Sequence, residues 1–79
     1  MTFYKEQDWE MALESFEQMA KDYPETRKLP EVLYHIGLCH LKLEKRGEAI
    51  RIFRKLIDEF PEDVWAEHAR ERLQELGVS

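Results

Sequence analysis

The segment Leu33–Pro61, LYHIGLCHLKLEKRGEAIRIFRKLIDEFP, decides the fold of this chain. Apolar, small and aromatic residues recur in it at steps of three and four, which is the spacing of one helical face: Leu33, Ile36, Gly37 and His40, then Ala49, Phe53 and Leu56. Between the two sets, Lys45–Gly47 is expected to form a tight turn or the start of a fused helix. Pro61 ends the second set, because proline has no amide N–H to donate. The segment therefore predicts two antiparallel helices.

The second half of this pattern also occurs earlier in the chain. Three positions recur at a spacing of 37 residues, namely Ala12 and Ala49, Phe16 and Phe53, and Pro24 and Pro61. A constant spacing of this size is typical of helical repeats, in which each unit buries its apolar face against the next. The sequence therefore predicts an all-α fold of antiparallel helix–turn–helix repeats.

About four helices are expected in total. The first is predicted over Trp9–Asp22 with Asp8 as its N-cap, since a carboxylate can accept from the free amides of the first turn. Its inward stripe comprises Trp9, Ala12, Leu13, Phe16, Met19, Ala20 and Tyr23. The second is expected from Pro30 to about Glu44 and the third from Glu48 to Phe60. The fourth should start near Asp63, bury Trp65, Ala66, Ala69, Leu73 and Leu76, and stop at Gly77.

Gly37 lies inside the second predicted helix, where a glycine costs about 1 kcal/mol relative to alanine. Close approach of two helices explains this residue best. Gly37 and Ala49, on the second and third predicted helices, both lack the bulk that would hold the two helices apart, and the small Cys39 fits the same explanation.

These positions resemble the tetratricopeptide repeat (TPR) family. The chain departs from the family pattern at Leu33, where tryptophan is usual, and at His40, where an aromatic residue is usual. The resemblance implies a single domain over 1–79. In it, 8–24 would be the second helix of a partial repeat, 30–61 a full repeat, and 62–77 a C-terminal capping helix.

The 37-residue spacing exceeds the usual TPR length by three, and the extra residues are expected in the connection 25–29. This spacing, with Tyr23-Pro24 and Phe60-Pro61 ending two helices, resembles the bacterial cell-envelope branch of the family. Members of that branch include a periplasmic factor associated with the Tol–Pal system and a lipoprotein of the outer-membrane assembly machinery. No signal peptide is visible at the N-terminus. The expected location is cytoplasmic for the chain as it stands, or periplasmic if the chain is a piece of an envelope protein.

The resemblance implies a protein–protein interaction module that binds an extended or helical segment on a concave surface, which the first helix of each repeat lines. The implied partner-binding residues are Tyr4, Lys5, Glu31, Tyr34, Leu38, Leu41 and Lys42. The last five share a helical face separate from the predicted buried face, so Tyr34, Leu38 and Leu41 would leave an open apolar patch. The alternative is that these residues pack against the last helix or the N-terminal segment.

A second expected surface lies on the first helix. Ala12, Phe16 and Met19 occupy positions that in the family pack against the first helix of the same repeat, for which only Phe3–Glu6 is available here. The exposed ends of helical repeats need polar caps. We therefore expect either a homodimer through this helix or a fragment of a longer array, so that a self-associating structural element is the alternative function.

Composition excludes other classes. The formal net charge is −5, and the chain is acidic at both ends around a mildly basic centre, which argues against nucleic-acid binding. No apolar run reaches the roughly 18 residues needed to span a membrane. Cys39 is the only cysteine, so no internal disulfide can form.

No catalytic or cofactor site is predicted. His35 and Cys39 are four residues apart and could face one metal ion, but a structural zinc needs four ligands and no second pair with this spacing exists. No glycine-rich phosphate loop is present, and Ser15 has no histidine nearby in the sequence. We therefore expect a non-enzymatic protein without cofactors.

Overall fold

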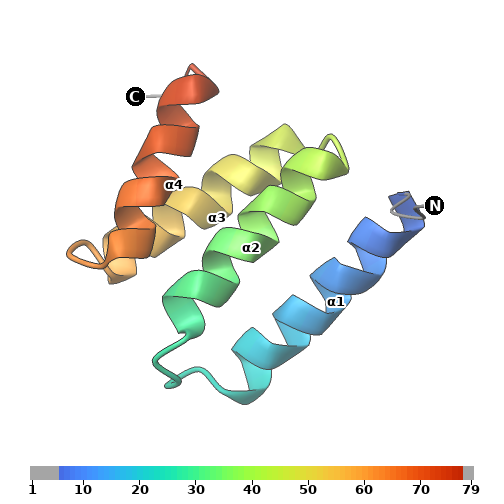
Figure 1. Cartoon of the computed structure of the whole chain (residues 1–79), viewed down its shortest axis with the longest axis horizontal. Coiled ribbons are helices and arrows are strands. Elements are labelled where there is room, and N and C mark those ends of the chain that lie inside the picture. Colours follow the sequence, from blue (N-terminus) through green and yellow to red (C-terminus); the bar gives the residue numbers. More distant parts are fainter. Residues whose placement is uncertain (1–5, 78–79) are drawn as a thin grey trace.

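The computed structural model describes residues 6–77, and these form four α-helices and no strand. The helices are α1 (Glu6–Asp22), α2 (Leu29–Lys42), α3 (Arg46–Glu59) and α4 (Val64–Glu75). Consecutive helices run in opposite directions (Figure 1). The predicted all-α, antiparallel helical repeat is confirmed. None of these helices combines the length and the apolar character that crossing a membrane requires.

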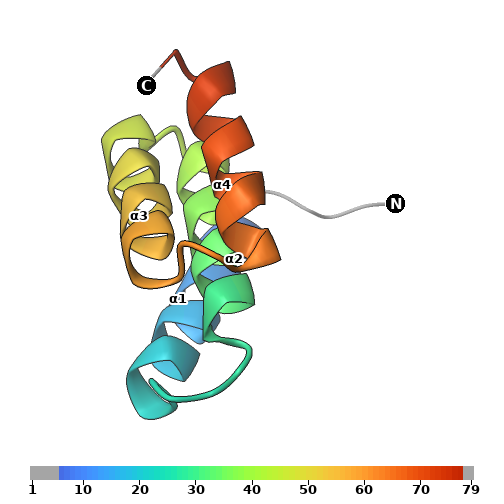
Figure 2. The same ribbon diagram turned by 90° about the vertical axis from the view of Figure 1, so that its left-hand side faces the viewer.

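Helix α2 is the centre of the molecule, because it packs against α1, α3 and α4. It lies between α1 and α3 in Figure 1, and the turned view in Figure 2 places α2 and α4 on one side and α3 on the other. Its buried residues are Leu29, Pro30, Val32, Leu33, Tyr34, Ile36, Gly37, Cys39 and His40. A helix buried on three sides needs this broad apolar surface.

The close packing of α2 and α3 depends on Gly37. A methyl group added at its Cα would lie 2.5–2.9 Å from three carbons of the Phe53 ring. The expected close approach of α2 and α3 at Gly37 is present, and the atoms nearest to this site belong to the Phe53 ring. The reason is that the aromatic side chain reaches across and fills the space that glycine leaves.

The short connection 43–45 joins α2 to α3, and α3 begins at Arg46, so a helix start is the one of the two predicted alternatives for Lys45–Gly47 that is observed. The residue in the left-handed conformation is Glu44, with a φ of 63°, whereas Gly47 lies within the first turn of α3. The Lys45 amide donates to the His40 carbonyl at 2.7 Å and the Glu44 amide donates to the Leu41 carbonyl at 3.0 Å. This pair of bonds is the Schellman termination, which usually places glycine where Glu44 stands.

The other helix ends follow the sequence more closely. The Asp63 carboxylate accepts from the Trp65 amide at 2.9 Å and caps α4, and Gly77, with a φ of 82°, terminates it. At the far end of the chain, α1 begins at Glu6. Asp8 therefore lies inside the helix, and the prediction that it is the N-cap is wrong.

Helix α1 is covered less than the others, since among the described helices it packs on α2 alone. Leu13 is buried, and Trp9, Ala12, Phe16 and Ala20 are partly buried against the core. Tyr23 was expected to face inward, but it follows the last residue of the helix and is 64% exposed. Met19, also in the predicted stripe, is 42% exposed.

Candidate functional site on the face shared by α2 and α4

Five aromatic side chains from three helices lie in contact across one face of the molecule, and we call them the ring band: Phe16, Tyr34, His35, Trp65 and His68. Phe16 of α1 stacks on His35 of α2 with ring centroids 5.4 Å apart. His35 lies 5.8 Å from Trp65 of α4, and Trp65 lies 5.3 Å from His68. The band therefore connects α1, α2 and α4 through their side chains.

The residues that α4 contributes to the band lie on one side of this helix, because they follow its periodicity. Ala66, Ala69 and Leu73 are buried against the core, whereas Trp65, His68 and Arg72 lie at steps of three and four on the side that meets α2. Trp65 is partly buried and His68 is exposed. The face shared by α2 and α4 thus offers aromatic surface to solvent.

Tyr34 forms the floor of the ring band. The sequence predicted that Tyr34 would lie on an open surface, but its side chain is 7% exposed, so that prediction is wrong. Its ring contacts Phe53, Trp65 and His68 at centroid distances of 5.8, 5.2 and 5.8 Å. The cause is α4, which packs directly over this position, as the alternative interpretation of the sequence held.

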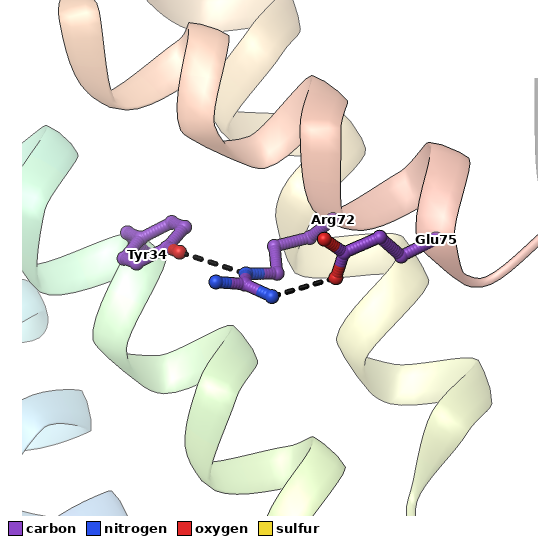
Figure 3. Close-up of polar contacts among 3 residues, drawn as sticks. All are labelled: Tyr34, Arg72 and Glu75. Carbon is purple, nitrogen blue, oxygen red and sulfur yellow. Dashed lines mark hydrogen bonds and ion pairs between the residues drawn. The ribbon is translucent and has the colours of Figure 1, made fainter.

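A chain of hydrogen bonds runs from Tyr34 to the end of α4 (Figure 3). Arg72 Nε donates to the Tyr34 hydroxyl at 3.0 Å, and Arg72 Nη1 donates to Glu75 Oε1 at 2.6 Å. The hydrogen bond to Tyr34 raises the pKa of Arg72 above its ordinary value, and the nearby Glu75 carboxylate adds to this. Arg72 therefore joins α2 to α4 at one edge of the band and is already partnered there.

At the opposite edge of the band, a carboxylate lies near a histidine ring. Glu31 Oε2 lies 3.8 Å from His35 Nε2, one turn along the same helix. Both side chains are partly exposed, so this contact contributes little to stability. Its effect is to place a carboxylate beside the ring of His35.

The other residues predicted to bind a partner occupy varied surroundings. Leu38 and Leu41 are partly buried and pack against the core, so the predicted open patch is smaller than expected. Lys42 is exposed, and its Nζ lies 5.7 Å from the centroid of the Trp9 ring, a cation–π distance. Tyr4 and Lys5 lie outside the described residues.

The predicted self-association surface is also partly covered. Ala12 and Phe16 are half-buried, and Phe16 contributes its ring to the band. Met19 is exposed, and Met11 is 67% exposed. Met11 and Met19 are therefore the exposed large apolar side chains of α1 within the part of the helix that the structure describes.

Cys39 and His40 lie at the contact between α1 and α2. Burial raises the pKa of the Cys39 thiol, and the Glu17 carboxylate raises it further. His40 is 7% exposed, with Nε2 at 4.0 Å from Glu17 Oε2. His35, the other half of the considered metal pair, turns its ring into the band instead. Within residues 6–77, no three His, Cys, Asp or Glu side chains come together as a metal site.

Sequence reasoning missed three members of the ring band, His35, Trp65 and His68. It assigned Trp65 to the core and gave the two histidines no role in an interaction surface. The information that could have identified them is the repeat itself: the first helices of successive repeats, α2 and α4, should meet along one face. Residues on the meeting sides of both helices then become candidates together.

Comparison with known proteins supports the same architecture. A sequence model described as tetratricopeptide repeat matches residues 1–26 and 31–63, which is more than half of the chain. The first segment contains α1, and the second contains most of α2 and all of α3. No curated protein and no solved structure matches the chain significantly.

Proposed function

Because the chain belongs to the tetratricopeptide repeat family, we propose that it is a non-enzymatic interaction module that binds a segment of another protein on the face shared by α2 and α4. Repeats of this family generally bind proteins. The observation that carries the proposal is the ring band, in which half-exposed aromatic side chains from separate helices form one surface. Aromatic residues are enriched at the centres of protein interfaces.

Residues around the band have distinct roles in this proposal. Trp65 and His35 supply the central contact area, and Leu38 extends it along α2. Glu31 and Lys42 lie on the outer part of α2, where polar groups fix the orientation of a partner more than its affinity. Leu41, Tyr4 and Lys5 complete the set inferred from the sequence.

Selection from a displayed library of random peptides tests the proposal. The peptides selected on the wild-type chain should bind at least tenfold more weakly to Leu38→Ser, with no loss of helical circular dichroism. Tyr23→Ser is the matched control, because it removes an exposed aromatic ring away from the band. Equal binding to both variants would place the surface elsewhere.

Self-association through α1 is the second candidate, and the exposed Met11 and Met19 favour it. Glu10, Glu14 and Glu17 on the same helix would oppose the close approach of a second copy, because like charges repel. The mass in solution across a hundredfold concentration range decides this question. A dimer that Met19→Glu dissociates would support it, whereas a constant mass of 9.6 kDa would refute it.

A cell-envelope role is a further part of the proposal. It is supported by the 37-residue spacing and by the connection 23–28 between α1 and α2, which is longer than the connection 60–63 between α3 and α4. Fractionation of cells that make the protein from its own gene would test it. Recovery with cytosolic markers alone would contradict an envelope location.

A further inference from the structure

We propose that the ring band takes a proline-rich segment in the polyproline II conformation, an inference that rests on the proposed function and specifies the partner of the same face. The four outer rings follow one another at centroid distances of 5.4, 5.8 and 5.3 Å, from Phe16 through His35 and Trp65 to His68. Polyproline II advances about 9 Å per turn of three residues. Consecutive rings of the band are therefore closer together than one turn is long, so one turn of the ligand can contact two of them.

The charges around the band favour an uncharged partner. Glu31 lies beside His35 at one edge, and Arg72 is paired with Glu75 and hydrogen-bonded to Tyr34 at the other. Between these edges lie the rings of His35, Trp65 and His68. A run of prolines carries no charge, so it can cover these rings without breaking the contacts of Arg72 with Tyr34 and Glu75.

The hydrogen-bonding character of the band fits the same partner. The carbonyl groups of polyproline II have no internal hydrogen bonds and are open to outside donors. Trp65 is half-exposed and carries an indole N–H, and His68 is exposed with a ring N–H. Aromatic side chains with a donor at the edge are the groups that line known polyproline-binding grooves.

The floor of the band keeps this surface in place. Tyr34 is held from below by the Phe53 ring and at its hydroxyl by Arg72. Trp65 follows Asp63, whose carboxylate accepts from the Trp65 amide and sets the start of α4. A preorganised surface loses little conformational entropy when a stiff ligand binds, so the rigidity of polyproline II is matched by that of the site.

Titration with three synthetic peptides of equal length tests the inference: a proline-rich peptide, an alanine-rich helical peptide and a glycine–serine peptide. The readout is the fluorescence of Trp65 in a Trp9→Phe background, since the chain has two tryptophans. We expect only the proline-rich peptide to shift the emission saturably. His68→Ala should weaken this binding about threefold. Trp65→Ala removes this fluorophore, so its binding is measured by the fluorescence anisotropy of a dye-labelled proline-rich peptide, and we expect it to be at least tenfold weaker than that of the parent chain. Tyr23→Ala should leave it unchanged.

His68 is exposed, so His68→Ala keeps the test valid even if Trp65→Ala fails to fold. Saturable binding of the helical peptide in place of the proline-rich one would overturn the inference and leave the proposed function intact. Binding of the proline-rich peptide that His68→Ala and Trp65→Ala do not weaken would also overturn it. If no peptide binds, the inference fails, and selection from the random library decides separately whether the proposed function fails with it.

Discussion

Helices α2 and α3 form a closed pair, whereas α1 is a half-covered helix beside them. In the pair, Ala49, Phe53 and Leu56 have no exposed surface, and α2 is buried over most of its length. In α1, Leu13 is the one buried residue among positions 9–22. The two regions share the Ala-x3-Phe-x7-Pro pattern, so the same local sequence gives very different burial.

This difference shows that burial in a repeat is set by neighbours more than by pattern. Phe53 lies on α3, which packs against both α2 and α4. Phe16, at the equivalent position, lies on α1, which packs against α2 alone among the described helices. Stability in stacked repeats is close to a sum of nearest-neighbour contacts. We therefore expect α1 to detach before the α2–α3 pair opens.

The largest expected effect comes from Phe53→Ala. Removing a fully buried phenylalanine costs about 3–5 kcal/mol, against a total of about 4–12 kcal/mol for a chain of this size. Urea unfolding followed by circular dichroism should show a chain close to unfolded at 37 °C. The matched variant Phe16→Ala should lose less than half as much.

Equal losses at Phe53 and Phe16 would contradict the contrast between the two regions. They would mean that α1 contributes as much to the cooperative core as α3 does. The partial exposure of Phe16 makes that outcome inconsistent with the structure.

Gly37→Ala should be the next largest effect. Alanine favours a helix by about 1 kcal/mol over glycine, but here its methyl group would meet the buried Phe53 ring at 2.5–2.9 Å. Overpacking of this kind costs about 1–3 kcal/mol, so the variant should be less stable in urea. Gly47→Ala is the control, because its added methyl group meets nothing within 4 Å.

A double-mutant cycle gives the second part of this test. Phe53→Leu shortens the ring side chain, so it should remove most of the penalty of Gly37→Ala. Additive losses in the double variant would show that the Phe53 ring is not the cause.

Particular residues show how far the sequence could predict this structure. Ala12, Phe16 and Pro24 each recur later in the chain at one constant spacing, and this was enough to predict the number and direction of the helices. The reason is that the periodicity of buried residues is a local property of the sequence. The position of Tyr34 was not predictable in the same way. Its burial depends on α4 crossing above it, and the sequence of α2 alone leaves the positions of Tyr34 and Leu38 equivalent.

The turn at Glu44 was missed for a different reason. Glycine is the strongest indicator of a left-handed residue, and Glu44, which has a φ of 63°, gives no such indication in the sequence. The ring band was missed because its members belong to three helices, and their contact exists only after the helices have packed. Long-range geometry of this kind is absent from the periodicity of any one segment.

Glu44→Gly should stabilise the α2–α3 pair. A non-glycine residue in the left-handed region costs about 1 kcal/mol or more. Glycine avoids this cost, but part of the advantage is lost because glycine has greater conformational freedom in the unfolded chain. We expect a net gain of about 0.5–1 kcal/mol in the free energy of unfolding, measured in urea. Glu48→Gly, inside the first turn of α3, should instead destabilise the chain.

The smallest effect concerns the contact between the two regions, where Cys39 of α2 lies under α1. Burial, and secondarily Glu17, raises the pKa of the thiol in the folded chain. Below the ordinary thiol value both states keep the proton, so the stability is unaffected. As the pH rises from the ordinary value through the raised one, the unfolded chain ionises first and the free energy of unfolding falls. Urea unfolding between pH 7 and 10 should show this fall relative to Cys39→Ala.

Glu17→Gln separates the contribution of α1 from that of burial. It removes the weaker cause of the raised pKa, so the fall in stability with pH should become smaller but should not disappear. Because Glu17 acts from α1, an identical pH dependence in wild type and Glu17→Gln would show that α1 is already detached at these pH values. Parallel curves for wild type and Cys39→Ala would contradict the buried position of the thiol itself. The pH profile of one cysteine therefore measures whether the half-covered helix stays docked on the closed pair.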